Sequence, residues 1–480
     1  MNVAVKPRIL NETMRIAGKK VSADRGLEVF NPYNNQVVGT VPLASVAQIR
    51  ETYEKVAPYK ATLSRHDRSK ILRTTAELLD KRREEIAALI TAESGLSMQD
   101  TLYEVGRAYD VFVLSSTLVL QDDGQIFSCD LTPHGQKRRI YTQRDPLKCI
   151  TAITPFNHPL NQVAHKVAPS IATNNKMVLK PSEKTPLTAL LLADVLYEAG
   201  LPPEMFSVVT GDPKEIADEM LTNSNVELIT FTGGVSVGKY IANKMGYRRV
   251  VLELGGNDPI IVMEDADVER AATLAAGGSY KNSGQRCTAV KRMIVHEAVA
   301  DEFVEKLVAK TRAWSYGDPT NRDNKMGTVI DEAAARYCQD MATDAVAKGA
   351  KLLHGNGREG ALYQPTVLDR VPFDAPLVKF ETFGPVSPVI RVKDIDDAIR
   401  VSNSTAYGLS SGVCTNRLDY ITRFVRELEV GTVNVWEVPG YRIEMSPFGG
   451  IKDSGLGYKE GVIEAMKSFT NVKTYSLPWG

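Results

Sequence analysis

Short apolar runs alternate with segments of helical periodicity from residue 149 onward. In the first block, the runs CITAIT, KMVLK, FSVVTG, VELITFT and RVVLEL are separated by helical patterns near 187–199, 213–222 and 237–245. Strands that alternate with helices in this way indicate βαβ units and a mostly parallel sheet. Residues 45–96, which precede the block, predict helices with charged outer faces.

A second block with the same alternation follows residue 290. Its apolar runs are RMIVH, AKLLH, VSPVIRV, LSSGVCT and GTVNVW, and its helical patterns cover 298–313, 331–347, 394–402 and 417–428. Two blocks of this kind predict an α/β fold with two domains, whose boundary we expect near 254–270.

The stretch 125–145 (QIFSCDLTPHGQKRRIYTQRD) fits neither block. Its pattern around Thr132–Gly135 predicts a β-hairpin, and the tail FTNVKTYSLPW alternates like another strand. We therefore expect 125–145 and 456–480 to form a small β element. Such strands either pair between subunits or lie as covered edges within one chain, and the pattern leaves both open.

Composition narrows the class of protein. The 480 residues carry 58 Lys and Arg against 58 Asp and Glu, so the formal net charge is zero. This balance argues against a nucleic-acid partner bound through overall basicity. No apolar run is long enough to span a bilayer, and the first residues lack the apolar core of a signal peptide. We therefore expect a cytoplasmic protein with no membrane partner.

The cysteines and histidines give no sign of a metal site. The five cysteines contain no Cys-x-x-Cys pair, and the six histidines form no cluster with metal-ligand spacing. No metal is expected, and unpaired cysteines fit a reducing compartment.

Two glycine motifs need to be weighed against other interpretations. GNGREG at 355–360 matches the dinucleotide fingerprint, but Pro365 stands where a helix should follow, so we interpret it as a surface turn. GVSVG at 234–238 matches the nucleophile elbow of serine hydrolases in the right strand–helix context, which makes a hydrolase that uses Ser236 an alternative. The same turn can instead bind a pyrophosphate at the start of a helix, or serve only close helix–strand packing.

A carboxylate and a cysteine carry the candidate chemistry. Glu253 ends the apolar run RVVLEL and is either a capped structural group or a buried base. Cys287 lies in the polar loop GQRCT, where we expect the neighbouring Arg286 to favour the reactive thiolate.

These segments belong to a longer series of motifs. TPFNHP, VLKPSEKTP, FTGG with SVG, LELGGNDP, GQRC, ETFGPV and PFGGIKDSG occur in this order along the chain. From about residue 25 to its end, the chain resembles the NAD(P)-dependent aldehyde dehydrogenase superfamily. The resemblance implies a Rossmann-like cofactor domain (1–124 and 146–254) and a second α/β catalytic domain (255–455). It also implies that the small β element bridges subunits of a homodimer or homotetramer.

The resemblance further implies catalytic roles. Cys287 would attack the aldehyde carbon to give a thiohemiacetal, whose oxyanion Asn157 would hold. After hydride transfer, Glu253 would activate the water that hydrolyses the resulting thioester. The presence of this Glu indicates a free acid product rather than a coenzyme A thioester.

The residues that the resemblance assigns to the cofactor lie in the same motifs. They are Thr154, Phe156, Lys180, Ser182, Glu183, Gly233, Gly234, Leu254, Glu381 and Phe383. Lys180 and Glu183 would contact the adenosine ribose, and a carboxylate there repels a 2′-phosphate. NAD is therefore favoured, with NADP as the weaker alternative.

Four basic residues, assigned to the substrate pocket by the resemblance, predict an anionic substrate: Arg107, His158, Arg286 and Arg442. A surface ion pair better explains each Arg taken singly, but their convergence would suit a doubly charged anion. The pattern is most similar to phosphonoacetaldehyde dehydrogenases, which implies oxidation of phosphonoacetaldehyde to phosphonoacetate in phosphonate breakdown. Glyceraldehyde 3-phosphate, lactaldehyde and carboxylate semialdehydes are the alternative substrates.

Overall fold

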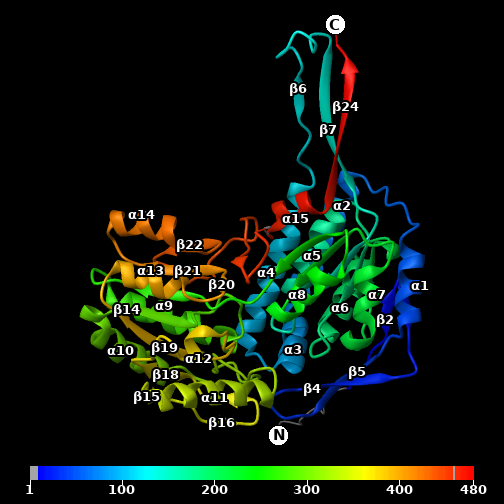
Figure 1. Cartoon of the computed structure of the whole chain (residues 1–480). Coiled ribbons are helices and arrows are strands. Elements are labelled where there is room, and N and C mark those ends of the chain that lie inside the picture. The colour runs from blue at the N-terminus through cyan, green and yellow to red at the C-terminus, as the bar shows by residue number, and fades with distance from the viewer. Residues whose placement is uncertain (1–8, 458–459, 480) are drawn as a thin grey trace.

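The computed structural model describes residues 9–457 and 460–479, and within them two seven-stranded sheets organise the body (Figure 1). The first sheet has the order β12-β11-β8-β9-β10-β2-β3. Its parallel strands are β8 (Ile150–Ile153), β9 (Met177–Lys180), β10 (Phe206–Val208), β11 (Leu228–Thr232) and β12 (Arg249–Glu253). An antiparallel hairpin, β2 (Met14–Ile16) and β3 (Lys19–Val21), extends the edge beside β10.

Helices cover both faces of this sheet. One apolar core lies under α2 (Arg65–Lys81), α3 (Arg83–Ser94), α4 (Met98–Leu118), α5 (Asn161–Ala172), α6 (Leu187–Glu198) and α15 (Val462–Ser468). A separate core lies under α1 (Val46–Val56), α7 (Pro213–Thr222) and α8 (Val235–Lys244). A mostly parallel sheet buried on both faces is the doubly wound arrangement that the alternation predicted.

The second sheet has the order β15-β18-β19-β14-β13-β21-β22. Its parallel strands are β13 (Pro259–Val262), β14 (Arg292–His296), β18 (Thr366–Asp369), β19 (Val386–Val392), β21 (Ser410–Cys414) and β22 (Thr432–Val435), with antiparallel β15 (Lys351–His354) at one edge. Its helices are α9 (Val268–Tyr280), α10 (Glu297–Arg312), α11 (Glu332–Ala347), α12 (Pro376–Lys379), α13 (Ile395–Asn403) and α14 (Leu418–Glu427). The α/β prediction is confirmed, whereas the domain limits stay a prediction.

Smaller elements complete the described chain. They are β1 (Leu10–Asn11), β4 (Gly26–Phe30), β5 (Val37–Pro42), β16 (Arg358–Glu359), β17 (Leu362–Tyr363), β20 (Tyr407–Gly408), β23 (Ile451–Lys452), and the 3₁₀ turns Pro203–Met205 and Lys281–Gly284. The motif 355–360 forms a loop, strand β16 and the start of the turn between β16 and β17, and β17 rather than a helix follows it, so its interpretation as a turn rather than a dinucleotide site is confirmed.

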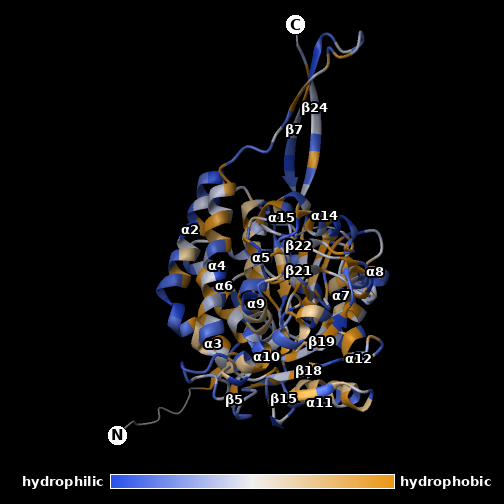
Figure 2. Ribbon diagram, turned by 90° about the vertical axis from the view of Figure 1, so that its left-hand side faces the viewer, coloured by the Kyte–Doolittle hydropathy of each residue, from blue (hydrophilic) through white to orange (hydrophobic). Residues whose placement is uncertain are grey.

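A three-stranded arm projects away from the body in both views (Figures 1 and 2). It consists of β6 (Ile126–Ser128), β7 (Arg138–Pro146) and β24 (Thr470–Pro478), in the order β24-β7-β6. The predicted hairpin is confirmed, including a turn in which the Gly135 N–H donates to the Thr132 carbonyl at 3.1 Å. Both outer strands of the arm have an open edge within the described residues.

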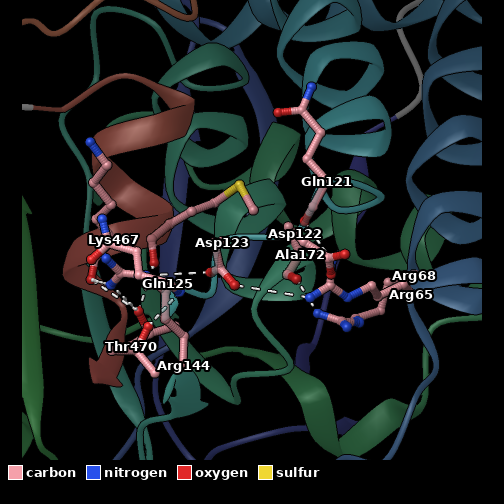
Figure 3. A network of polar contacts seen from close by, with 12 residues as sticks. Arg65, Arg68, Gln121, Asp122, Asp123, Gln125, Arg144, Ala172, Lys467 and Thr470 are labelled. Carbon is pink, nitrogen blue, oxygen red and sulfur yellow. Dashed lines mark hydrogen bonds and ion pairs between the residues drawn. The ribbon is translucent and has the colours of Figure 1, made fainter. Parts of the chain in front are cut away.

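Charged side chains fix the base of the arm (Figure 3). The Asp123 carboxylate lies between two guanidiniums, 3.3 Å from Arg144 on β7 and 3.9 Å from Arg65 on α2. Arg144 also donates to the Thr470 hydroxyl at 3.1 Å, where β24 begins. These contacts connect both chain segments of the arm to the helices that cover the first sheet.

No helix within residues 9–457 and 460–479 combines the length and the apolar character that crossing a bilayer requires.

Candidate active site

The first sheet creates a binding edge where its strand order reverses. The chain runs from β8 through β9 to β10 on one side of β8, and then returns to β11 and β12 on the other side. The loops after the adjacent strands β8 and β11 therefore lead to opposite faces of the sheet. In open α/β sheets, ligands bind in the crevice between two such loops. The predicted cofactor residues Thr154, Phe156, Gly233 and Gly234 all lie in these two loops.

The turn after β11 leaves an open helix N-terminus. Gly234 caps α8 without any side-chain hydrogen bond, and a Cβ built on it would meet no atom within 4 Å. Its small size is therefore not required by packing within the chain, unlike that of Gly238, where a Cβ would lie 2.5 Å from Leu254. A helix start with free N–H groups and open space fits a pyrophosphate.

Ser236 lacks the partners that the hydrolase alternative requires. It is an exposed residue in the first turn of α8, and among the described residues no histidine forms a hydrogen bond with it. Without a base within reach, the hydroxyl has no route to activation.

The adenosine end of the predicted cofactor site lies at the end of β9. Lys180 is buried and its Nζ lies 3.5 Å from the carboxylate of the exposed Glu183. Burial lowers the pKa of Lys180, which Glu183 opposes. The Ser182 hydroxyl accepts the Lys184 N–H at 3.2 Å, and the buried Thr154 hydroxyl has no partner among the described atoms. These exposed and unpaired polar groups fit the ribose hydroxyls that the resemblance implies.

The nicotinamide end is lined by an aromatic pair and a carboxylate. The rings of Phe156 and Phe383 meet edge to face with their centroids 5.9 Å apart, which brings the two predicted cofactor motifs together. Glu381 accepts the Gly256 N–H at 3.1 Å, and burial raises the pKa of its carboxyl. A Cβ at Gly255 would lie 2.2 Å from the Glu381 carboxylate, so a larger residue there would displace this side chain.

The nucleophile loop has an unusual backbone. Asn282 and Ser283 adopt left-handed conformations with φ of 58° and 54°, and Gly284 follows with φ of 70°. A Cβ at Gly284 would lie 2.4 Å from the Gly384 carbonyl, so the loop runs directly against the motif ETFGPV. Left-handed non-glycine residues are uncommon and cluster at functional sites.

The charged groups around the Cys287 thiol include more than the Arg286 that the sequence indicated. Burial raises the pKa of the thiol to about 11, and the positive charges of Lys291 and Arg442 oppose this increase. Nη2 of Arg286 donates to the Gly278 carbonyl at 2.6 Å. The expectation that Arg286 favours the thiolate stays a prediction: its guanidinium interacts electrostatically with Cys287, while one of its donors is directed at α9.

Asn157 and Glu253 flank the cysteine from the first sheet. Asn157 is buried, and one of its amide hydrogens is donated to the Gln285 carbonyl at 2.8 Å. Glu253 ends β12 with 4% exposure and lines the same cavity as Cys287. An amide carries two hydrogens, so Asn157 keeps one for an oxyanion. The roles of these residues stay predictions.

A cavity of about 1210 Å³ brings the four predicted basic residues together with the cysteine. Its lining includes Arg107, His158, Arg286, Arg442, Cys287 and Glu253. Burial and the positive charges of the three arginines lower the pKa of His158 well below its ordinary value, so this imidazole is neutral at pH 7. The residues that sequence analysis placed in one pocket therefore do converge.

The three arginines differ in how their charge is balanced. Arg107 is paired, because its Nε donates to the Glu444 carboxylate at 2.6 Å. Neither Arg286 nor Arg442 has a carboxylate within ion-pair distance among the described residues, and Nη1 of Arg442 is buried without a hydrogen-bond partner. Two guanidiniums that line the cavity without a carboxylate in direct contact favour an anionic ligand.

Two acidic residues that organise the site, Glu444 and Glu104, were missed at the sequence level. Glu444 accepts from Arg107 and, at 2.5 Å, from the buried His165; although burial opposes it, these contacts hold the pKa of the Glu444 carboxyl well below its usual range. Glu104 of α4 accepts the N–H groups of Leu160 and Asn161 at 2.8 and 2.9 Å. It thereby caps α5 directly after the loop that carries Asn157. Isolated acidic residues on helices and loops give no sequence signal for such long-range contacts.

Comparison with known proteins covers nearly the whole chain. A model of the aldehyde dehydrogenase family matches residues 19–475. A 3-sulfolactaldehyde dehydrogenase of Priestia megaterium is 37% identical over 452 residues, which are 94% of this chain and 94% of the relative. A lactaldehyde dehydrogenase of Methanococcus aeolicus is 35% identical over 457 residues, 94% of this chain and 97% of the relative. The crystal structure of an NADP-dependent glyceraldehyde-3-phosphate dehydrogenase from Bacillus halodurans, complexed with NADP, superimposes with a TM-score of 0.95 at 33% identity, covering 98% of this chain and all of that one.

Proposed function

Because the chain belongs to the aldehyde dehydrogenase family and so oxidises a small aldehyde with NAD or NADP, we propose that its substrate carries a negatively charged group at the end remote from the aldehyde. The observation that carries this proposal is the pair Arg286 and Arg442, whose guanidiniums face the same cavity as Cys287 without a carboxylate partner among the described residues. A guanidinium presents parallel N–H donors that match the oxygens of a phosphonate, sulfonate or phosphate.

The chemistry begins at Cys287. Its thiolate attacks the aldehyde carbon, and the carbonyl oxygen becomes an oxyanion that accepts from the free Asn157 amide hydrogen and the Cys287 backbone N–H. Phe156, Glu381 and Phe383 would hold the nicotinamide, which would supply the acceptor for the hydride that leaves the thiohemiacetal. The substrate would then remain on Cys287 as a thioester. Glu253 takes a proton from water as the water attacks the thioester, and the thiolate leaves to release a carboxylic acid.

The proposal leaves open which anionic group the substrate carries. Phosphonoacetaldehyde is the substrate that the sequence motifs favour, whereas the relatives named above act on 3-sulfolactaldehyde, lactaldehyde and glyceraldehyde 3-phosphate. Two of these three carry a tetrahedral oxyanion, which agrees with the unpaired guanidiniums. The pairing of Arg107 with Glu444 reduces the uncompensated charge and therefore weakens the argument for a dianion alone. A compound with any tetrahedral oxyanion two to four bonds from the carbonyl carbon fits the proposal.

For the cofactor we favour NAD over NADP. The Glu183 carboxylate lies at the end of β9 where the ribose is expected, and a 2′-phosphate placed there would meet its negative charge. The unpaired Thr154 hydroxyl and the open turn at Gly234 support binding of either dinucleotide.

We further propose that the chain forms a homodimer or homotetramer through its arm. The open edges of β6 and β24 offer unpaired backbone groups, which favours pairing with another copy.

A substrate panel tests the proposal. Purified protein with NAD is given phosphonoacetaldehyde, 3-sulfolactaldehyde, glyceraldehyde 3-phosphate, succinate semialdehyde, lactaldehyde and butyraldehyde, and NADH formation is followed at steady state. We expect kcat/KM for at least one compound with a tetrahedral oxyanion to exceed that for butyraldehyde by about 100-fold or more, as the loss of one buried charge contact implies. Equal values for charged and neutral aldehydes would refute the proposal.

A further inference from the structure

Lys291 places a buried ammonium group beside the backbone of the nucleophile loop. The side chain, from the residue before β14, is 1% exposed. Its Nζ donates to the carbonyl oxygens of Arg286 at 2.7 Å and Cys287 at 2.6 Å, and lies 3.2 Å from the Glu381 carboxylate. An ammonium has three N–H donors, and these three acceptors use all of them.

These contacts join segments that are far apart in the chain. Glu381 belongs to the motif ETFGPV and also accepts the Gly256 N–H, which lies in the loop after β12. The backbone N–H of Lys291 donates to the Asp258 carbonyl at 3.0 Å, in the same loop. Lys291 is therefore the point at which the nucleophile loop, the loop after Glu253 and the Glu381 segment are held together.

The charge of this side chain does more than fill space: it provides a counterion for the Glu381 carboxylate and donors for two backbone carbonyls. An uncharged side chain would fill the same space without the cost of removing an ammonium from water, and that cost is recovered only if its charge is used. Its two shortest contacts are to the carbonyl oxygens of Cys287 and Arg286. The ammonium therefore lies against the peptide segment that carries the Cys287 thiol.

Other charged or titratable groups also face the thiol. They are Asp258, Glu253, Glu381, Arg286, Arg442 and His158. Among these surroundings, burial and the carboxylates of Asp258 and Glu381 raise the pKa of the thiol, whereas Lys291 opposes the increase more strongly than Arg442 does.

We infer that Lys291 is a positioning residue for the reaction, which fixes the backbone of Cys287 and stabilises its thiolate through a positive charge held beside the loop. The inference rests on the proposed function in taking Cys287 as the nucleophile. It adds Lys291 to Arg286, for which the sequence had suggested an effect on the thiolate.

The test measures thiol reactivity directly, without aldehyde or cofactor. The rate at which iodoacetamide alkylates Cys287 is followed by mass spectrometry between pH 7 and pH 10.5 in the parent protein and in the Lys291→Met variant. An opposite charge within a few ångströms lowers the pKa of an acid by about one to three units. We therefore expect Lys291→Met to alkylate at least about tenfold more slowly at pH 8.5 and to shift the pH profile upward. Lys291→Arg should recover part of the rate, because it keeps the charge.

A double variant separates charge from folding. Lys291→Met leaves Glu381 buried without its partner, so the same substitution is also made in the Glu381→Gln background, where no buried carboxylate is left unpaired. Slower alkylation in the double variant than in Glu381→Gln supports the inference, and equal rates overturn it. The surface variant Lys239→Met, with a side chain 58% exposed, is the matched control and should alkylate like the parent protein.

The outcome is independent of whether Cys287 is the catalytic nucleophile. If Cys287→Ala retained turnover, the proposed function would fail while the alkylation profile still reported the effect of Lys291 on the thiol. If Cys287→Ala abolished turnover and Lys291→Met left the alkylation profile unchanged, the role of Lys291 alone would be refuted.

Discussion

Replacing Arg442 by methionine removes one of the two unpaired guanidiniums from the cavity and retains most of the side-chain volume. Arg442 stacks on the Phe448 ring at 4.1 Å, a contact that methionine preserves in part. With an effective dielectric constant of about 20, two unit charges about 4 Å apart interact with about 4 kcal/mol. Loss of a partner from a buried charge pair typically costs about 2–5 kcal/mol.

The carboxylates of Glu444 and Glu460 offset part of the field of Arg442. We therefore expect the lower part of that range, which corresponds to a loss of about 30- to 300-fold in kcat/KM at about 1.4 kcal/mol per tenfold change. The loss should appear with the anionic aldehyde that reacts best in the panel, and should be less than about threefold with butyraldehyde.

The assay is steady-state NADH formation with both aldehydes, for the parent protein, Arg442→Met and Arg442→Lys. Lysine keeps the charge but loses the paired donors, so its loss with the anionic aldehyde should lie between the other two values. An equal loss with both aldehydes in Arg442→Met would refute the reasoning, since it would show that Arg442 supports the site rather than the charge of the substrate.

Three further predictions concern titration and cofactor choice. Because burial raises the pKa of Cys287 to about 11, the alkylation rate of the parent protein should rise about tenfold per pH unit between pH 7 and pH 10; a plateau below pH 8 would contradict this. Glu183→Ala should increase kcat/KM with NADP relative to NAD by about tenfold or more, because it removes a negative charge from the expected 2′-phosphate position; an unchanged ratio would place the ribose elsewhere. Burial raises the pKa of Glu104 from 4.5 to about 8, so the folded state binds a proton more tightly than the unfolded state, and stability due to this group falls as the pH rises from about 5 to 8. Glu104→Gln keeps the capping acceptor and cannot ionise, so its melting temperature should fall less over that interval than that of the parent protein.

The alternation of apolar and polar positions along the chain was sufficient to predict many of the helices and strands. Helices such as α7 and α10 have one buried face and one exposed face, and their predicted limits lie within one residue of the observed ones. Helix α5 was missed because Pro169 lies inside it; all twelve of its residues are buried, so its polar residues mark no exposed face. Strands β13 and β18, of four residues each, were also missed.

The sequence predicted those residues of the candidate site that lie in short, recognisable motifs. Cys287, Glu253 and the four basic positions lie in segments whose neighbours in sequence define their context, and the fold brings them to one cavity. The contacts of Lys291, Glu444 and Glu104 depend on residues up to 337 positions away, such as Arg107 with Glu444, and no local pattern encodes them. For the same reason the sequence did not reveal that Arg107 is already paired.

The covalent intermediate gives the most direct test of the account, because it reports both the nucleophile and the selection of the substrate. Glu253→Gln protein is mixed with NAD and equal concentrations of phosphonoacetaldehyde and butyraldehyde, quenched in acid, digested, and analysed by mass spectrometry. Without the base that activates water, the thioester should accumulate on the peptide that contains Cys287, with one NADH formed per acylated chain. The account predicts a phosphonoacetyl adduct on Cys287 in large excess over a butyryl adduct. A butyryl adduct in equal amount, or NADH formation with no adduct on Cys287, would contradict it.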